Sequence, residues 1–149
     1  MVQKVKRDKE FFKIAKEIME SEEFKQLVGI KHHNKTSRYE HSLRVAYWSY
    51  VIAKRFKWRV KEVVRGALLH DLIYECDKDV GFNTHPKRAL ENALIAFDLT
   101  EIEKDIIYKH MFPSYLAMPK YKESWLVCII DTISAIKEFC TLRASQVEG

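Results

Sequence analysis

The chain has 149 residues, a length that suits one compact domain. Hydrophobic residues make up 47% of it and charged residues 32%, so we expect both a sizeable core and a well-hydrated surface. Only four glycines and three prolines are present, which argues against a turn-rich β-sandwich or barrel. These numbers predict a single domain over residues 1–149, built from a few long helices.

The net charge of +5 is modest. A mildly basic surface attracts anionic partners such as phosphorylated metabolites. Lysines and arginines alternate with acidic residues along most of the chain, which argues against nucleic acid as the partner. The one clearly basic run, residues 4–7, is expected to be a solvated terminus.

The three cysteines, Cys76, Cys128 and Cys140, form no CxxC pair. An odd count with scattered spacing indicates free thiols in a reducing compartment. The first residues are charged and lack the apolar segment of a signal peptide. The longest strongly apolar stretch, residues 125–136, contains an aspartate and is too short to span a bilayer. We therefore expect a cytoplasmic protein that does not use a membrane.

Hydrophobic residues recur at helical spacing through most of the chain, starting near its beginning. The first predicted helix covers residues 7–20, and Ser21 then caps a short second helix that ends near Gly29. The polar segment 30–37 is predicted to be irregular. A long helix is expected to follow over residues 38–56.

The middle of the chain predicts a helix, a loop and another helix. The first of these helices lies near residues 60–70 and contains Gly66, which would let a neighbouring helix approach closely. Residues 73–83 are rich in turn-forming residues and predict a loop. A new helix begins near His85, because the proline that follows it favours the first helical positions.

Two further helices complete the predicted fold. Thr100 and Glu103 form a capping box, which opens a helix that runs to about residue 111. A loop bracketed by two prolines follows, and the last helix covers residues 122–142. No alternating pattern is long enough to demand a sheet, so the predicted class is all-α with about six or seven helices.

Asp131 is the residue least expected at its position. It lies inside the apolar segment 126–133, and its helical neighbours at three and four residues include no cation. A carboxylate that is buried without a partner destabilises the fold strongly, so its partner must come from elsewhere in the chain or from a metal ion. A buried ion pair or a helix-capping acceptor would explain the residue as well as a metal site would.

Two other positions raise the same question. The pair His70-Asp71 closes an apolar helix, and near a helix end both side chains can reach one ion. A lone His-Asp pair is nevertheless more often a plain helix terminus. His41 lies beside an apolar helix face, where a lone histidine is usually a core or boundary residue.

The order of these residues is more informative than any one of them. His41, the pair His70-Asp71, and Asp131 lie in different predicted helices, and this nitrogen and oxygen set suits Mn, Fe, Co, Ni or Zn. The sequence resembles the HD-domain superfamily of metal-dependent phosphohydrolases, whose signature is a His, a His-Asp doublet and a distant Asp. The resemblance covers about residues 38–135, and it implies a helical bundle in which these four residues hold a divalent transition metal.

Two more histidines extend the resemblance. In one group of HD proteins the signature becomes His, His-Asp, His, His, Asp and binds two metals; this group includes hydrolases similar to the branch that cleaves diadenosine tetraphosphate. His85 and His110 supply the added positions in order, and the segment 38–41 also looks like the opening of that branch. By resemblance, His85 and His110 hold the second ion and Asp71 bridges the two. The alternative is that His85 merely starts a helix and His110 caps one.

The chain departs from this pattern at two places. Many dinuclear HD proteins carry a lysine a few residues after the doublet and another directly after the last aspartate. Here residues 72–75 contain none, and Thr132 follows the last aspartate. These departures favour one alternative, a catalytically degenerate module that contains metal and senses a nucleotide. A helical interaction protein, in which the histidines and aspartates are structural, is the other.

The resemblance implies hydrolysis of a phosphate ester or anhydride by metal-activated water, with a nucleotide or a similar small phosphorylated metabolite as substrate. Asp71 takes part through the metal centre. Arg38 lies one turn before His41 and is expected to bind phosphate. Lys109 is a further candidate for phosphate binding, and Glu75 for relaying a proton, although either could be a surface charge. The sequence leaves open the native metal, whether one or two ions bind, and whether the protein is a homodimer.

Overall fold

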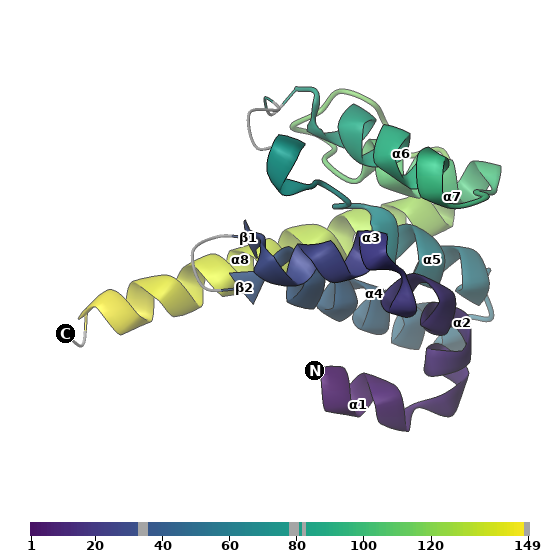
Figure 1. Ribbon diagram of the computed structural model, residues 1–149, viewed down its shortest axis with the longest axis horizontal. Coiled ribbons are helices and arrows are strands. Elements are labelled where there is room, and N and C mark those ends of the chain that lie inside the picture. Colours follow the sequence, from purple (N-terminus) through teal and green to yellow (C-terminus); the bar gives the residue numbers. More distant parts are fainter. Residues whose placement is uncertain (33–35, 78–80, 82, 148–149) are drawn as a thin grey trace.

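The computed structural model of the chain describes residues 1–32, 36–77, 81 and 83–147, with side chains up to residue 140. The fold is all-α, as predicted. The described residues form eight α-helices, two 3-10 turns and one small β-ribbon (Figure 1). In chain order the helices are α1 (Val2–Arg7), α2 (Lys9–Glu20), α3 (Glu22–Lys25), α4 (Arg38–Arg55), α5 (Val60–Leu69), α6 (His85–Ala96), α7 (Glu101–Lys109) and α8 (Lys122–Val147).

The first predicted helix is in fact two helices, because Asp8 interrupts it. The backbone of Asp8 is extended, and its carboxylate accepts a hydrogen bond of 3.1 Å from the Phe11 amide, which makes it the N-cap of α2. The basic side chains of residues 4–7 are exposed, as expected of a solvated terminus, but the segment is helical and one of its residues is buried. These residues belong to α1, and Val5 is fully buried against the core.

Helix starts that carry a cap in the sequence lie where they were expected. The Ser21 hydroxyl accepts from the Phe24 amide and opens α3, which passes into a 3-10 turn over Gln26–Gly29. At α7 both bonds of the capping box form, since Thr100 and Glu103 each accept from the other's backbone amide.

The segment predicted to be irregular contains a short antiparallel ribbon. Strand β1 (Lys31–His32) pairs with β2 (Thr36–Ser37), with His32 opposite Thr36. The pairing is too short to show as an alternating pattern in the sequence. It holds Lys31 and His32 beside the first turn of α4.

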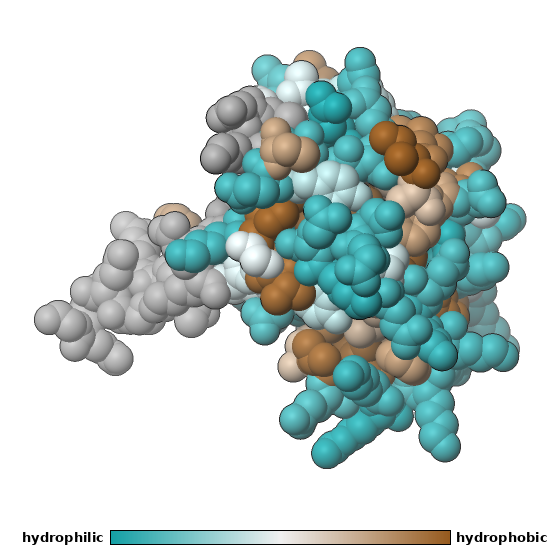
Figure 2. Space-filling view, in the orientation of Figure 1, coloured by the Kyte–Doolittle hydropathy of each residue, from teal (hydrophilic) through white to brown (hydrophobic). Residues whose placement is uncertain are grey.

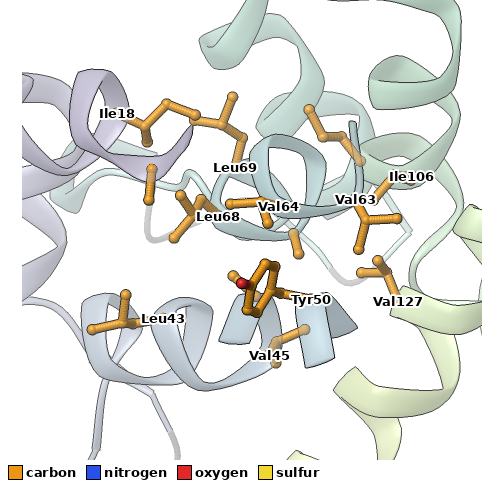
Figure 3. Close-up of a cluster of buried hydrophobic side chains, with 14 of the residues drawn as sticks. Ile18, Leu43, Val45, Tyr50, Val63, Val64, Leu68, Leu69, Ile106 and Val127 are labelled. Carbon is orange, nitrogen blue, oxygen red and sulfur yellow. The ribbon is translucent and has the colours of Figure 1, made fainter. Parts of the chain in front are cut away.

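Helix α5 is the centre of the core. Every residue from Val63 to Leu69 is buried, and the helix packs against α2, α4, α6, α7 and α8. Figure 3 shows side chains of α5 such as Leu68 and Leu69 lying between Ile18 of α2 and Leu43 of α4. Most of its buried residues are apolar, and the exception, Arg65, is paired with acidic side chains.

The close approach predicted at Gly66 is present. A Cβ atom at this position would lie 2.8 Å from Cδ1 of Ile106, closer than carbon atoms can pack. The missing side chain therefore lets α7 lie directly on α5. This contact fixes the distance between the ends of the two helices.

Helix α8 is the longest element and runs beyond the rest of the bundle (Figure 1). One face packs on α4, α5 and α7, while Ile129, Ile133, Ile136 and Phe139 are exposed. Most of the molecular face in Figure 2 is hydrophilic, with hydrophobic residues in separate patches. Within the described residues, no helix combines the length and apolar character needed to cross a bilayer.

Candidate metal centre

A cavity of about 540 Å³ lies where the ends of several helices meet. Its polar lining comes from β1, from α4, from the residues that follow α5 and α7, from the start of α6 and from the middle of α8. All six metal ligands expected from the sequence line it, together with Arg38: they are His41, His70, Asp71, His85, His110 and Asp131. Met111, Phe112 and Ile136 form an apolar wall on one side.

His70 and His110 are held in the same way. Each occupies the C-cap position of its helix, α5 or α7, and its Nδ1 lies 2.7 Å from the carbonyl oxygen three residues earlier, in Ala67 or Ile107. Donation of the Nδ1 proton to that carbonyl leaves Nε2 as the nitrogen with a lone pair. His110 is thus a helix cap, as one interpretation of the sequence held, and it also faces the cavity.

The ring of His41 lies between two carboxylates. Its Nε2 is 2.8 Å from Oδ1 of Asp131, and its Nδ1 is 3.0 Å from Oε1 of Glu138. Both partners can only accept while ionised, so the ring donates at both nitrogens. Burial alone would lower the pKa of His41, but the hydrogen bonds to the two carboxylates raise it to about 9.

Asp131 obtains its partners from distant parts of the chain, as its apolar neighbours required. They are His41 on α4 and His70 after α5, whose Nε2 lies 3.5 Å from Asp131 Oδ1. Burial works against ionisation, but these histidines hold the pKa of Asp131 well below its usual value. In the neutral His70 ring with its proton on Nδ1, by contrast, the Nε2 lone pair and the Asp131 carboxylate face each other as two acceptors.

Asp71 has one satisfied oxygen and one unsatisfied oxygen. Its Oδ1 accepts from the Arg38 guanidinium and lies 2.7 Å from Nε2 of His85. Its Oδ2 is buried and has no hydrogen-bond partner among the described residues. Burial opposes its charge, yet His85 and Arg38 hold the pKa of Asp71 far below its usual value.

These donors fit a metal ion. Ligand atoms of His41, His70 and Asp131 all lie within 4.8 Å of one another. A cation would resolve the two facing acceptors and would engage the unsatisfied oxygen of Asp71. On the other side, the rings of His85 and His110 are 5.8 Å apart, and burial lowers the pKa of His110 to about 4, so that it stays neutral and able to bind a cation.

A protein-family model, the HD domain, matches residues 38–136, about two thirds of the chain. The chain belongs to the HD-domain family. As an HD domain it is a member of the HD metal-dependent phosphohydrolase superfamily, whose members bind divalent metals and act on small phosphorylated substrates. A search of curated proteins and a search of solved structures each gave no match.

Two residues predicted from the sequence lie away from this cavity. Lys109 does not line it, and its Nζ is 2.6 Å from Oδ1 of Asp105, one turn earlier on α7. Glu75 is exposed and lines a smaller neighbouring cavity of about 370 Å³. Arg38, in contrast, lines both cavities, as does Lys31.

Three residues of the HD-domain cavity and its surroundings were not predicted from the sequence. Lys31 and His32 were assigned to an irregular segment, and no local pattern shows that the ribbon turns them toward α4. Glu138 had a usable signal, because it follows Asp131 by seven residues and so shares its helix face. Its pKa is far below the usual value because, although burial opposes its charge, His32 and His41 hydrogen-bond to its ionised form.

Proposed function

We propose that this HD domain hydrolyses a phosphate ester or anhydride of a nucleotide, or of a similar small phosphorylated metabolite, with water as the nucleophile. One observation carries the proposal. Six histidine and aspartate side chains from separate elements line one cavity, and an arginine stands beside them. The unsatisfied oxygen of Asp71, and the His70 nitrogen that faces Asp131, suit metal binding better than they suit a purely structural role.

In this proposal His41, His70 and Asp131 hold one ion, His85 and His110 hold a second, and Asp71 lies between the two. A bound divalent metal supplies a Lewis acid and lowers the pKa of its water. The mixed nitrogen and oxygen set favours Mn, Fe, Co, Ni or Zn. The hydrogen bonds from Nδ1 of His70 and His110 to backbone carbonyls orient the rings before anything binds.

Arg38 is the proposed phosphate ligand. Its Nη1 is engaged by Asp71, which holds the guanidinium at the wall of the cavity. The side chain is 18% exposed and lines the cavity, so the guanidinium can still donate to a phosphate oxygen there. Lys31 lines the same cavity and adds a second positive charge. Together they offset the charge that the phosphate carries and develops during reaction.

The smaller cavity supports a substrate with an organic group beyond its phosphate. It shares Lys31 and Arg38 with the main cavity, and its remaining lining includes Tyr74, Ile30 and Ile73. A phosphate held at the shared wall would leave room there for a flat apolar group. An aromatic ring beside aliphatic side chains is suited to a nucleobase.

A second candidate is a metal-containing module that binds a nucleotide without turnover. One observation favours it: Thr132 stands directly after the last aspartate and lines the cavity, but its hydroxyl donates to the carbonyl of Cys128 at 2.9 Å. The position therefore offers the substrate no cation.

The test begins with metal analysis of protein purified without a histidine tag. Metal-loaded protein is then assayed for product release from nucleoside mono-, di- and triphosphates, dinucleoside polyphosphates and a generic phosphodiester. We expect turnover that Asp71→Asn abolishes and that Asp98→Asn, a change at an exposed aspartate, leaves intact. Nucleotide binding without turnover would favour the sensing module. Substoichiometric metal that is insensitive to Asp71→Ala and Asp131→Ala would rule out both.

A further inference from the structure

Glu138 holds two histidines with its two oxygen atoms. The residue lies on α8 and is buried. Its Oε1 accepts from Nδ1 of His41 at 3.0 Å, and its Oε2 accepts from Nδ1 of His32 at 3.2 Å. Arg44 donates to Oε1 at 2.5 Å and balances the carboxylate charge. One side chain thus fixes the same nitrogen in both rings.

The two rings are also stacked on each other. Their centroids are 4.0 Å apart and their planes differ by 27°. Since Glu138 holds Nδ1 in each ring, Nε2 is in each case the nitrogen that faces the cavity. His32 Nε2 lies 3.8 Å from Oδ2 of Asp71, the buried oxygen without a hydrogen-bond partner among the described residues. His32 therefore presents to the cavity the same atom that His41 presents.

Both His32 and Glu138 lie outside the residues that match the HD-domain model, 38–136. Ordered elements nonetheless position them. His32 is placed by its pairing with Thr36 in the ribbon, and Glu138 continues α8 two turns beyond Asp131. The arrangement is therefore a property of this chain and is not part of the four-residue family signature.

We propose that His32 is an additional ligand of the metal centre through Nε2, and that Glu138 is the positioning residue that orients both His32 and His41. This inference rests on the proposed function, since it assumes that the centre binds metal. A carboxylate on Nδ1 fixes the tautomer of a ligating histidine and makes its Nε2 more basic. An additional imidazole next to Asp71 would increase the affinity and fill a coordination position.

The same side chains could in principle form a separate site. Ligand atoms of His32, His41 and Glu138 lie within 4.8 Å of one another. Arg44 argues against an ion there, because its guanidinium already contacts the carboxylate and would repel a cation. An ion bound between His41 and Glu138 would also require His41 to give up its hydrogen bond with Glu138. The geometry therefore favours one centre to which His32 is added.

The experiment measures metal binding to the metal-stripped protein, residues 1–149. Affinities for Mn²⁺ are obtained by titration calorimetry for the wild type, His32→Ala and Glu138→Gln. The matched control is Glu103→Gln, which also removes a buried carboxylate partner of an arginine but lies away from the centre. We expect affinity to fall by about 10- to 100-fold in His32→Ala and in Glu138→Gln, and to be unchanged in the control.

The number of bound imidazoles gives a second readout. In the Co²⁺-loaded protein each ligating histidine gives a paramagnetically shifted N–H proton signal. His32→Ala should remove one of these signals, and Glu138→Gln should make the signals of His32 and His41 exchange faster with solvent. Unchanged affinity and an unchanged signal count in His32→Ala would overturn the role of His32 alone. A wild-type protein that binds no metal would overturn the proposed function as well.

Discussion

Helix α5 connects two buried polar clusters whose surroundings are opposite. At Arg65, all three nitrogens of the guanidinium have partners: Nε donates to Glu103 at 2.9 Å, Nη1 to Glu17 at 2.5 Å and Nη2 to the carbonyl of Asp98 at 3.0 Å. The second oxygen of Glu103 accepts from the Thr100 amide. The network is complete without any ligand.

Just beyond the C-terminal end of α5 the hydrogen bonding is incomplete. Asp71 Oδ2 and Arg38 Nε are buried and have no hydrogen-bond partner within the described residues, and His70 Nε2 faces the carboxylate of Asp131. Unsatisfied atoms of charged groups are costly to bury, and a bound ion would compensate for them. The difference shows why burial of a polar residue does not by itself identify a functional site. The informative sign is unused donor or acceptor capacity on charged groups that line a cavity.

The largest expected effect distinguishes the two clusters by their role in metal binding and turnover. Replacing Asp71 with Asn should reduce metal content and lower the turnover rate to below about a thousandth, because a neutral amide would bind divalent cations much more weakly than a carboxylate. Metal analysis and the product-release assay measure both quantities. Retention of full metal content and activity would show that the incomplete cluster is structural after all.

The second expected effect distinguishes the two clusters by their contribution to folding stability. Arg65→Met should lower the free energy of unfolding by about 3–5 kcal/mol, because it leaves the Glu103 carboxylate buried without its partner. Urea denaturation of the metal-free protein measures this loss. The number of ions bound at saturating metal should not change. If Arg65→Met lost its metal as readily as Asp71→Asn, the two clusters would not be independent.

The third effect is a pH dependence confined to the metal centre. Without metal, His41 carries a proton up to its pKa of about 9, and it must release that proton before Nε2 can bind an ion. Apparent metal affinity should therefore fall by about tenfold for each pH unit below 9, and become nearly independent of pH above it. Calorimetric titrations in buffers of different ionisation enthalpy would count the released protons. Absence of proton release near pH 7 would contradict this assignment.

The smallest effect concerns a thiol next to the centre. Cys128 is buried one turn before Asp131, and burial raises the pKa of its thiol to about 11, so it stays protonated and should not act as a ligand. Iodoacetamide at pH 8 should label the exposed Cys76 and Cys140 but not Cys128. Mass spectrometry after digestion identifies the sites. The pattern should be the same with and without metal, and labelling of Cys128 only in the metal-free protein would indicate that a thiolate joins the centre.

Much of the helical fold could be predicted, because helical periodicity and caps are local properties. The capping box at Thr100 and Glu103 is one example, and the cap at Ser21 is another. The break at Asp8 was missed because the apolar spacing of α2 does not show where the preceding turn ends. The β1–β2 ribbon was missed because two residue pairs form no pattern.

Only those residues of the candidate site could be predicted whose order along the sequence was itself informative. His41, His70, Asp71 and Asp131 are individually weak signals, yet their succession across separate helices pointed to one cavity. The location of Lys109 depended on which side of α7 faces the centre, and there Asp105, one turn away, engages it. Recognising His32 required knowing that a ribbon returns the chain to the start of α4. That information is not local.

Gly66 supplies no atom to the metal centre, yet the spacing of the centre depends on it. It lets α7 rest on α5, and these two helices end in His70 and His110, whose rings lie 4.9 Å apart. A single methyl group at Gly66 would separate two imidazoles that it never touches. In a saturation mutagenesis screen for metal binding, this backbone position should therefore be among the least tolerant in the chain, even though no inventory of reactive side chains would include it.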